Sequence, residues 1–551
     1  MLDKKNKNVL LKIVGLAVAV FLLVYIGTIF MGGGGEKTLD GIDKEIDVTE
    51  MPPTKGLVDI SGIDIAATLP DISKYPPQVN SSTSSYIEIF SSTEKAGSGT
   101  DGWLTEVARD FNNAKIMIDG KQTSVRLRGI ASGQGADYIT SGEYLPDAYT
   151  PSNELWGEML ISRGVDARLV QKRLAGNAAG ILITKSKKAE LEAKYGAVNV
   201  TTVIDSVANN ELQMGYTNPF ASSTGLNFLI STLQAIDASN PLSNKAIAGF
   251  DRFQENIPVV AYTTLQMREA AKSGVLDAFV LEYQTYVNTP DIRSYEFIPF
   301  GVRHDSPIYA IGKLSPEKTK ILDEFIKFSQ QENYQNLATK YGFNGLDEYR
   351  SEFVPASGDV LIQAQKLWKE KKNANICAVF VADVSGSMDG EPLNNLKKSL
   401  LEGQKYIGKD NLIGLVSYSD DVYINLPISR FDLNNRSYFV GAVGGLQAGG
   451  ATATFDGIAV AMKMLEEQLA LDPKLKPKIF VLSDGETNRG HSLNDIRKLV
   501  EESGIPIYTI GYNADIKALE EISLVNEAAS INADTEDVVY KLANLFNAEL
   551  A

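Results

Sequence analysis

The stretch Ile376-Cys-Ala-Val-Phe-Val-Ala-Asp-Val-Ser-Gly-Ser-Met388 joins an unbroken apolar run to a short segment of oxygen-bearing side chains. Such a run is typical of a parallel strand that is covered on both faces. Leu412–Tyr418, Lys478–Leu482 and Ile505–Ile510 have the same character, and stretches with one apolar helical face lie between them. This alternation predicts a doubly wound, Rossmann-like α/β sheet over residues 375–551, with ligands at the carboxyl ends of its strands.

Oxygen donors follow the ends of these predicted strands. Asp383 ends the first apolar run, Ser385 and Ser387 come directly after it, and Asp484 follows a later strand. Thr452 comes after paired glycines and just before a predicted helix. Two carboxylates and three hydroxyls make a set of hard oxygen donors that suits Mg²⁺, with Mn²⁺ or Ca²⁺ as alternatives. The sequence therefore predicts a divalent-cation site formed by these five residues.

The order of these motifs resembles the von Willebrand factor A domain and its metal-ion-dependent adhesion site. An Asp-x-Ser-x-Ser motif, a Thr after paired glycines and an Asp after a later strand are all matched within residues 375–551. The resemblance implies that Asp383, Ser385, Ser387 and Thr452 approach the ion directly or through water. It also implies that Asp484 completes the set from the outer shell, and that the ion accepts an acidic side chain from a partner protein.

Residues 86–345 form another α/β region, in which strand-like runs alternate with amphipathic helices. Its stretches Tyr86–Glu94, Tyr144–Trp156, Gly215–Phe228 and Leu281–Asn288 come in an order that resembles bacterial extracellular solute-binding proteins, in the two-lobed group that includes oxyanion binders. The resemblance implies two α/β lobes joined by crossover strands, with a small solute or oxyanion held in the cleft and hinge closure around it. On that analogy the candidate cleft residues are Ser91, Ser92, Ser223, Thr224 and Tyr283. For each serine-rich loop taken alone, helix capping is the alternative interpretation.

The sequence of the N-terminal region predicts a helix that anchors the chain in a membrane. Ile13–Met31 carries no charged residue and is long enough to cross a bilayer as one helix. Lysines precede it, so the positive-inside rule places residues 1–12 in the cytoplasm and the bulk of the chain outside, as in a single-pass bacterial membrane protein. A cleaved signal peptide is the alternative, although no clear cleavage motif follows the apolar run. Residues 32–85, rich in Asp, Pro, Ser and Thr, predict an extended stalk, and residues 346–374 predict a linker.

The composition narrows the classes of function. A formal net charge of −16 argues against nucleic-acid binding, because few groups would neutralise phosphates. The single cysteine, Cys377, lies in an apolar run and is expected in the core. No His, Lys or Cys lies within the predicted metal motifs, so we expect no enzyme, with a metal-assisted hydrolase as the less favoured alternative.

These observations predict a membrane-anchored binding protein. Its C-terminal domain would engage an acidic group of a partner protein through the metal, while the middle region binds or senses a small solute. The alternative is an accessory, substrate-binding component of a transport system.

Overall fold

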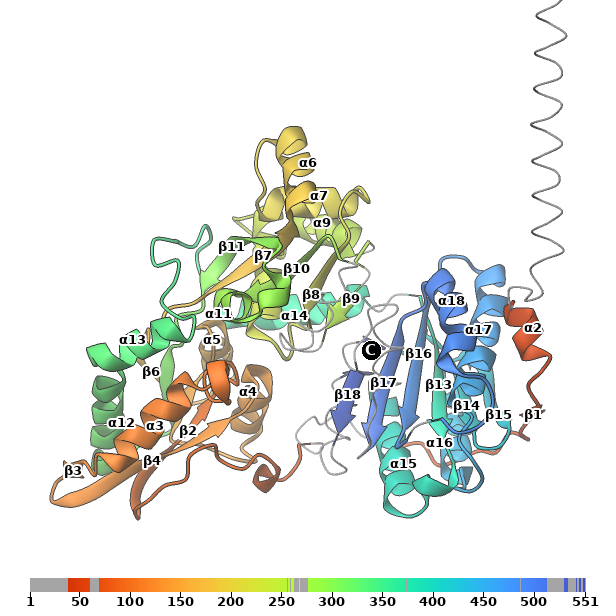
Figure 1. Cartoon of the computed structure of the whole chain (residues 1–551), viewed down its shortest axis with the longest axis horizontal. Helices are drawn as coiled ribbons and strands as arrows, with labels where there is room; N and C mark the ends of the chain where they lie inside the picture. Colours follow the sequence, from red (N-terminus) through yellow and green to blue (C-terminus); the bar gives the residue numbers. More distant parts are fainter. Residues whose placement is uncertain are drawn as a thin grey trace, which may run out of the picture.

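The computed structural model describes residues 38–59, 69–254, 276–372, 375–485 and 487–512, together with short stretches between 256 and 267 and between 530 and 550. The membrane span predicted at residues 13–31 lies outside this part of the chain. None of the helices within the described residues is both long and apolar enough to cross a bilayer. Figure 1 shows a middle module and a C-terminal domain, each built from helices and sheets. The mixed α/β character predicted for both regions is confirmed.

The first lobe of the middle module is built on a six-stranded sheet of order β3-β4-β2-β5-β12-β6. Its strands are β2 (Ser85–Ser91), β3 (Met117–Ile118), β4 (Lys121–Gly129), β5 (Ala148–Thr150), β6 (Ala167–Gln171) and β12 (Ile308–Ile311). Its helices are α3 (Trp103–Asn113), α4 (Ser132–Ser141), α5 (Leu155–Ser162), α12 (Pro316–Ser329) and α13 (Glu332–Lys340). Ile87 and Ile89 of β2 share one buried cluster with Trp103 and Phe111 of α3. This packing fixes the carboxyl end of β2 at Ser91.

The second lobe is built on a five-stranded sheet of order β11-β7-β10-β8-β9. Its strands are β7 (Ala178–Thr184), β8 (Met214–Thr217), β9 (Val259–Ala261), β10 (Ala278–Glu282) and β11 (Tyr295–Arg303). Its helices are α6 (Lys185–Tyr195), α7 (Val200–Ala208), α8 (Ser223–Ile236), α9 (Asn244–Gln254) and α11 (Tyr283–Asn288). Ile181 and Val280 of neighbouring strands pack in one cluster with Phe228 of α8. Helix α8, which starts at Ser223, is thereby held against the sheet.

The chain passes between the two sheets twice, at residues 172–177 on the way from β6 to β7 and at residues 304–307 on the way from β11 to β12. The two crossing segments touch, because the N–H of His304 donates a hydrogen bond to the carbonyl oxygen of Asn177 at 3.0 Å. The described architecture thus has two α/β lobes joined by paired crossovers.

The segment predicted as a linker contains a helix that belongs to the middle module. Helix α14 (Gly358–Lys372) packs against both α5 and α8, and therefore against both lobes. Leu361, Ala364 and Trp368 are buried along one of its faces. The indole N–H of Trp368 donates a hydrogen bond to the hydroxyl of Tyr216 at 2.5 Å. Burial of this apolar face explains why residues 358–372 are helical rather than an extended linker.

The C-terminal domain contains a seven-stranded sheet of order β1-β15-β14-β13-β16-β17-β18. Its strands are β13 (Ile376–Asp383), β14 (Leu412–Tyr418), β15 (Val422–Arg430), β16 (Lys476–Ser483), β17 (Ile507–Tyr512) and β18 (Ser530–Ala533), with β1 (Val48–Glu50) from far upstream. Its main helices are α15 (Glu391–Gly403), α16 (Leu433–Gly445), α17 (Thr454–Leu471) and α18 (Leu493–Ser503). All pairings are parallel except the one between β14 and β15.

Alternate residues of β13 enter two separate buried clusters on opposite faces of this sheet. Phe380 packs with Phe439 of α16 on one face. Val379 and Val381 pack with Ile458 of α17 on the other. Helices therefore cover both faces, as the apolar character of the strand predicted.

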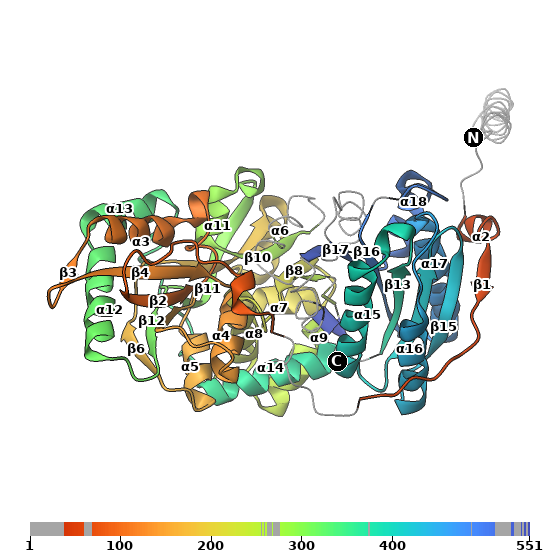
Figure 2. The same ribbon diagram turned by 90° about the horizontal axis from the view of Figure 1, so that it is seen from below.

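Residues 38–59, which we call the strap, differ from the extended stalk that the sequence predicted over residues 32–85. Helix α2 (Leu39–Asp43) packs against α17, and Ile42 is completely buried there. Strand β1 pairs in parallel with β15 and extends the sheet (Figure 2). Backbone groups on the edge of a sheet need hydrogen-bond partners, and β1 supplies them along β15.

Beyond β1 the strap crosses α16. The N–H of Gly56 donates to the carbonyl oxygen of Ser437 at 2.8 Å, and the Ser437 hydroxyl donates to the carbonyl oxygen of Gly56 at 2.7 Å. Lys55 donates to Oδ1 of Asn434 at 2.7 Å, and its ammonium lies over the ring of Tyr438. The strap is thus part of the C-terminal domain, although the middle module separates the two in sequence.

Gly441 of α16 provides a local test of this docking. A Cβ added at Gly441 would lie 2.0 Å from the carbonyl oxygen of Thr54 in the strap. We therefore expect Gly441→Ala to lower the free energy of unfolding by about 1–3 kcal/mol, as overpacking does. Gly444→Ala on the same helix is the control, because no atom lies within 4 Å of its added Cβ. Equal midpoints for the two variants in urea unfolding would contradict the docked strap.

Candidate metal centre and interlobe cleft

Four of the five predicted metal-site residues meet where β13 and β16 end. Asp383 is the last residue of β13, and Asp484 directly follows β16. The Ser387 hydroxyl donates to Oδ1 of Asp484 at 2.9 Å, and the hydroxyl oxygens of Ser385 and Ser387 lie 3.0 Å apart. The N–H of Ser385 donates to Oδ1 of Asp383 at 2.8 Å. We call this group, together with Thr452, the metal rim.

Thr452 belongs to the loop that precedes α17. The N–H of Gly386 donates to the carbonyl oxygen of Gly450 at 2.9 Å, which ties this loop to the Ser385–Ser387 loop. The N–H of Thr452 donates to Oδ1 of Asn488 at 2.9 Å, and its carbonyl oxygen accepts from the Thr487 hydroxyl at 2.7 Å. Its Oγ1 makes no hydrogen bond with another described residue. The backbone is fixed while the hydroxyl remains available to a ligand.

The two carboxylates of the rim carry uncompensated charge. Asp383 is completely buried, and burial raises the pKa of its carboxyl even though Ser483 and Ser385 donate hydrogen bonds to it. Burial also raises the pKa of Asp484. Neither carboxylate forms an ion pair with a cationic side chain in the part of the chain described. Buried carboxylates of this kind are stabilised by a cation.

The donor set fits a small divalent cation and not a metal bound by a cluster of carboxylates or histidines. No group of three or more His, Cys, Asp or Glu side chains suited to a metal occurs among the described residues. The rim instead combines Asp383 and Asp484 with the hydroxyl oxygens of Ser385, Ser387 and Thr452. Mg²⁺ is held in proteins by one or two carboxylates and keeps other positions for water or a partner oxygen.

Another polar site lies between the lobes of the middle module, where a cavity of about 50 Å³ remains. The first lobe contributes Ser92, Thr93, Glu94, Ser132 and Ser152 to its wall. The second lobe contributes Ser222, Ser223, Glu282 and Thr285. We call this cavity the cleft.

Two of the five predicted cleft residues, Ser92 and Ser223, line the cleft. Ser91 is buried, and its hydroxyl donates to the carbonyl oxygen of Ser92. Thr224 is not among the lining residues, but its hydroxyl donates to the lining residue Glu282 at 3.3 Å. Tyr283 is not among the lining residues, and its ring stacks edge-on against Phe297. The structure places Ser91, Thr224 and Tyr283 outside this lining, because adjacent residues of a strand or turn point in different directions.

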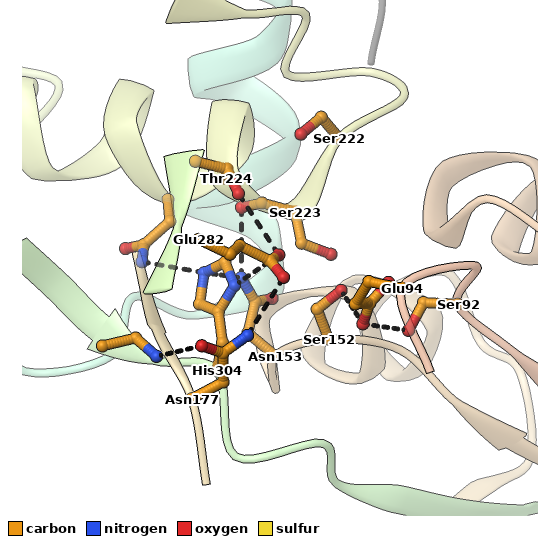
Figure 3. A network of polar contacts seen from close by, with 12 residues as sticks. Ser92, Glu94, Ser152, Asn153, Asn177, Ser222, Ser223, Thr224, Glu282 and His304 are labelled. Carbon is orange, nitrogen blue, oxygen red and sulfur yellow. Dashed lines mark hydrogen bonds and ion pairs between the residues drawn. The ribbon is translucent and has the colours of Figure 1, made fainter. Parts of the chain in front are cut away.

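A buried polar network supports the second-lobe wall of the cleft (Figure 3). Oε1 of Glu282 lies 2.9 Å from Nδ1 of His304, and its Oε2 accepts from Asn177 at 3.1 Å. Nε2 of His304 lies 3.0 Å from the side-chain amide nitrogen of Asn153 and 3.1 Å from that of Asn227. His304 and Asn177 are the residues of the two crossovers that touch. The network therefore joins both lobes at the point where a hinge would bend.

Glu94 and Lys95 form a buried pair on the first-lobe side. Oε1 of Glu94 accepts from the hydroxyls of Ser92 at 2.6 Å and Ser152 at 2.9 Å, and lies 3.5 Å from the Lys95 ammonium. Burial opposes ionisation of Glu94, but Lys95 and the two hydroxyls outweigh it and lower the pKa of the carboxyl. Glu94 therefore remains ionised at neutral pH. Glu94 and Ser152 are not among the predicted cleft residues, although they lie within the stretches Tyr86–Glu94 and Tyr144–Trp156.

Comparison with protein families agrees with the C-terminal geometry. Residues 378–548 match the von Willebrand factor type A domain, abbreviated VWA, so the C-terminal domain is a VWA domain. The bovine inter-alpha-trypsin inhibitor heavy chain H3 is 28% identical over 161 residues, which are 27% of this chain and 18% of that protein. The chain thus spans less than a fifth of the length of this curated relative.

The structural neighbours of the middle module are solute-binding proteins. A periplasmic thiamin binding protein is similar over 52% of this chain and 96% of its own, at 10% identity and a TM-score of 0.39. The sulfate-binding protein SubI from Mycobacterium tuberculosis H37Rv is similar over 51% of this chain and 91% of its own, at 13% identity and a TM-score of 0.34. The two-lobed organisation itself rests on the sheets and crossovers described above.

Proposed function

Starting from the VWA domain at residues 378–548, we propose that this chain is a membrane-anchored extracytoplasmic binding protein. The metal rim engages a partner protein through a divalent cation, with Mg²⁺ favoured, while the middle module binds or senses a small solute. The role is one of binding and not of catalysis. Membrane attachment rests on the uncharged run Ile13–Met31, and the orientation rests on the lysines that precede it.

The proposed protein-binding role is supported mainly by the set of oxygen donors in the metal rim. Asp383 and Asp484 supply two carboxylates without a cationic partner among the described residues, and Thr452 presents an uncommitted hydroxyl. These residues, with Ser385 and Ser387, would hold the ion. Bound there with few negative charges around it, Mg²⁺ supplies an electrophilic position for a carboxylate oxygen of the partner. Ser387 and Asp484 lie toward solvent, where a partner can approach.

Capture of partners by the full-length chain tests this role. We expect proteins recovered from bacterial surface extracts in the presence of Mg²⁺ to be lost when a chelator is added. Thr452→Ala should reduce their recovery about tenfold, because it removes one oxygen from the ion's surroundings. Thr201→Ala, at an exposed position of α7, is the matched control and should leave recovery unchanged. Recovery that is insensitive to both chelator and Thr452→Ala would refute metal-dependent engagement.

The two-lobed module favours a second candidate, an accessory component of a transport system. In that role the cleft delivers a solute to a permease, and the VWA domain organises the complex. Deletion of the chain would then reduce uptake of the solute, and variants of the metal rim would reduce it as well. A purely adhesive role predicts unchanged uptake.

A further inference from the structure

Thr452 of the metal rim is held in place by the loop of residues 487–491. The carbonyl oxygen of Thr452 accepts hydrogen bonds from the backbone N–H groups of Asn488 at 3.0 Å and Arg489 at 3.2 Å. Together with the two side-chain contacts described above, these bonds join the backbone of Thr452 to the loop on both its N–H and its carbonyl side. The position of the Thr452 hydroxyl at the metal rim therefore depends on where this loop lies.

His491 fixes the end of the loop against α17. Its backbone N–H donates to Oδ1 of Asp456 at 2.9 Å, and its ring nitrogen Nδ1 lies 2.7 Å from the same oxygen. Asp456 lies in the first turn of α17, which begins just after Thr452. The side chains of His491 and Asp456 are only 11% and 12% exposed, so water competes little for this contact. The loop and the start of α17 are thereby held together around Thr452.

The strap contacts the other nitrogen of the same ring. Oε2 of Glu45, between α2 and β1, lies 3.2 Å from Nε2 of His491. The imidazole is thus placed between a carboxylate of the strap and a carboxylate of α17. Because the Glu45 side chain is 65% exposed, this contact contributes little by itself.

The strap reaches the loop before α17 by a second route, through the turn of residues 419–421 between β14 and β15. The N–H of Ala453 donates to the carbonyl oxygen of Ser419 at 3.1 Å. Directly after this turn, the N–H of Val422 donates to the carbonyl oxygen of Asp47 in the strap, also at 3.1 Å. The pairing of β1 with β15 begins at the same place. The strap therefore contacts both of the segments that surround the loop before α17.

We infer that the strap and His491 are positioning elements of the metal rim, which hold Thr452 where its hydroxyl meets the cation. This inference rests on the proposed metal-dependent function and names the segment that regulates it. Coupling between two binding equilibria is reciprocal, so docking of the strap strengthens Mg²⁺ binding, and Mg²⁺ disfavours detachment of the strap by the same factor. In the sequence, the strap is the described segment nearest to the predicted membrane span. The anchored end of the chain would thus be coupled to its partner-binding end.

Hydrogen exchange of the full-length chain, with chelator and then with saturating Mg²⁺, tests the inference. The backbone N–H groups of Met51 and Gly56 donate to β15 and α16, so their exchange reports detachment of the strap. We expect Mg²⁺ to slow their exchange about tenfold, the size typical of groups that orient metal ligands. The amides of α3 in the middle module should exchange equally in both conditions.

Three variants test the contacts of His491. His491→Ala removes both ring contacts and should weaken Mg²⁺ binding in calorimetry about tenfold. Glu45→Gln and Glu50→Gln make the same chemical change at two exposed positions of the strap, and only Glu45 faces His491. We expect a smaller loss of Mg²⁺ affinity for Glu45→Gln and none for Glu50→Gln. A merely structural role of His491 would lower the stability of the metal-free chain and leave its Mg²⁺ affinity unchanged.

The outcomes separate the role of the strap from metal binding itself. If Mg²⁺ slows exchange at residues 384–388 and 449–453 but not in the strap, the inference is overturned and metal binding stands. Slowing at none of these amides would contradict both. Because the exchange experiment uses the wild-type chain, its result does not depend on whether His491→Ala folds. An unchanged Mg²⁺ affinity in His491→Ala would overturn the role of His491.

Discussion

Removing the strap, residues 38–59, is expected to lower the free energy of unfolding of the VWA domain by about 4 kcal/mol or more. Burial of the Ile42 side chain contributes about 2 kcal/mol. The backbone hydrogen bonds between the strap and β15, among them the one from Met51 N–H to the Ile424 carbonyl oxygen, contribute about 1 kcal/mol each. The exposed ion pair of Asp40 with Lys463 adds little, since solvent screens it. Deletion also leaves the edge of β15 open to association with other chains.

The chain contains separate reporters for its two parts. All three tryptophans, Trp103, Trp156 and Trp368, lie in the middle module, so their fluorescence follows the unfolding of that module. The single cysteine, Cys377, is completely buried in β13 of the VWA domain, and burial raises its pKa to about 12. Its labelling by a thiol reagent therefore reports the opening of the VWA domain.

With these reporters, the strap deletion should move the urea midpoint of Cys377 labelling to a lower concentration. The midpoint of tryptophan fluorescence should remain where it is in the full-length chain. A deletion that leaves Cys377 labelling unchanged, or that shifts both midpoints equally, would contradict the assignment of the strap to the VWA domain.

Asp383→Asn is expected to abolish the stabilisation of the VWA domain by Mg²⁺ without destabilising the metal-free protein. The side chain keeps its size and still accepts from Ser385, while the buried charge is gone. We expect the affinity for Mg²⁺ to fall about 100-fold or more, since a carboxylate of the donor set is lost. The exposed Asp389 in the same loop provides the control variant, Asp389→Asn. A fall in metal-free stability alone, with the Mg²⁺ response retained, would show that Asp383 is structural.

The same carboxylate gives the metal-free domain a defined dependence on pH. Because burial raises the folded-state pKa of Asp383, its contribution to stability is present below the unfolded pKa and is lost as the pH rises through the folded pKa. The stability difference between the wild-type chain and Asp383→Asn should therefore shift in favour of the wild type as the pH falls through the folded pKa toward the unfolded pKa. Denaturant titrations at several pH values with chelator present would measure this difference.

The metal rim could be predicted because its geometry follows from local rules. Asp383 and Asp484 each come where an apolar parallel strand ends, and neighbouring parallel strands end at the same edge of a sheet. Helix α14 was predictable too, since Leu361, Ala364 and Trp368 recur at the spacing of one helical face. The same spacing favours a helix at residues 358–372 over the linker predicted for residues 346–374.

The positions of the strap and of the cleft residues depend on contacts between segments that are far apart in the sequence, and no local sequence pattern predicts such contacts. The side chains of Val48–Glu50 are exposed, and their strand is defined by the free edge of β15. Glu94 and Ser152 are brought together by the pairing of β2 with β5 in one register. Such pairings are set by the packing of the whole lobe, and sequence periodicity within one segment does not specify them.

Calorimetric titration of the chelator-treated full-length chain with Mg²⁺ is the most direct test of the metal rim. The structure predicts heat of binding at one site and a higher urea midpoint for Cys377 labelling once the ion is present. Absence of any heat with either Mg²⁺ or Mn²⁺, together with an unchanged midpoint, would contradict the metal-dependent function.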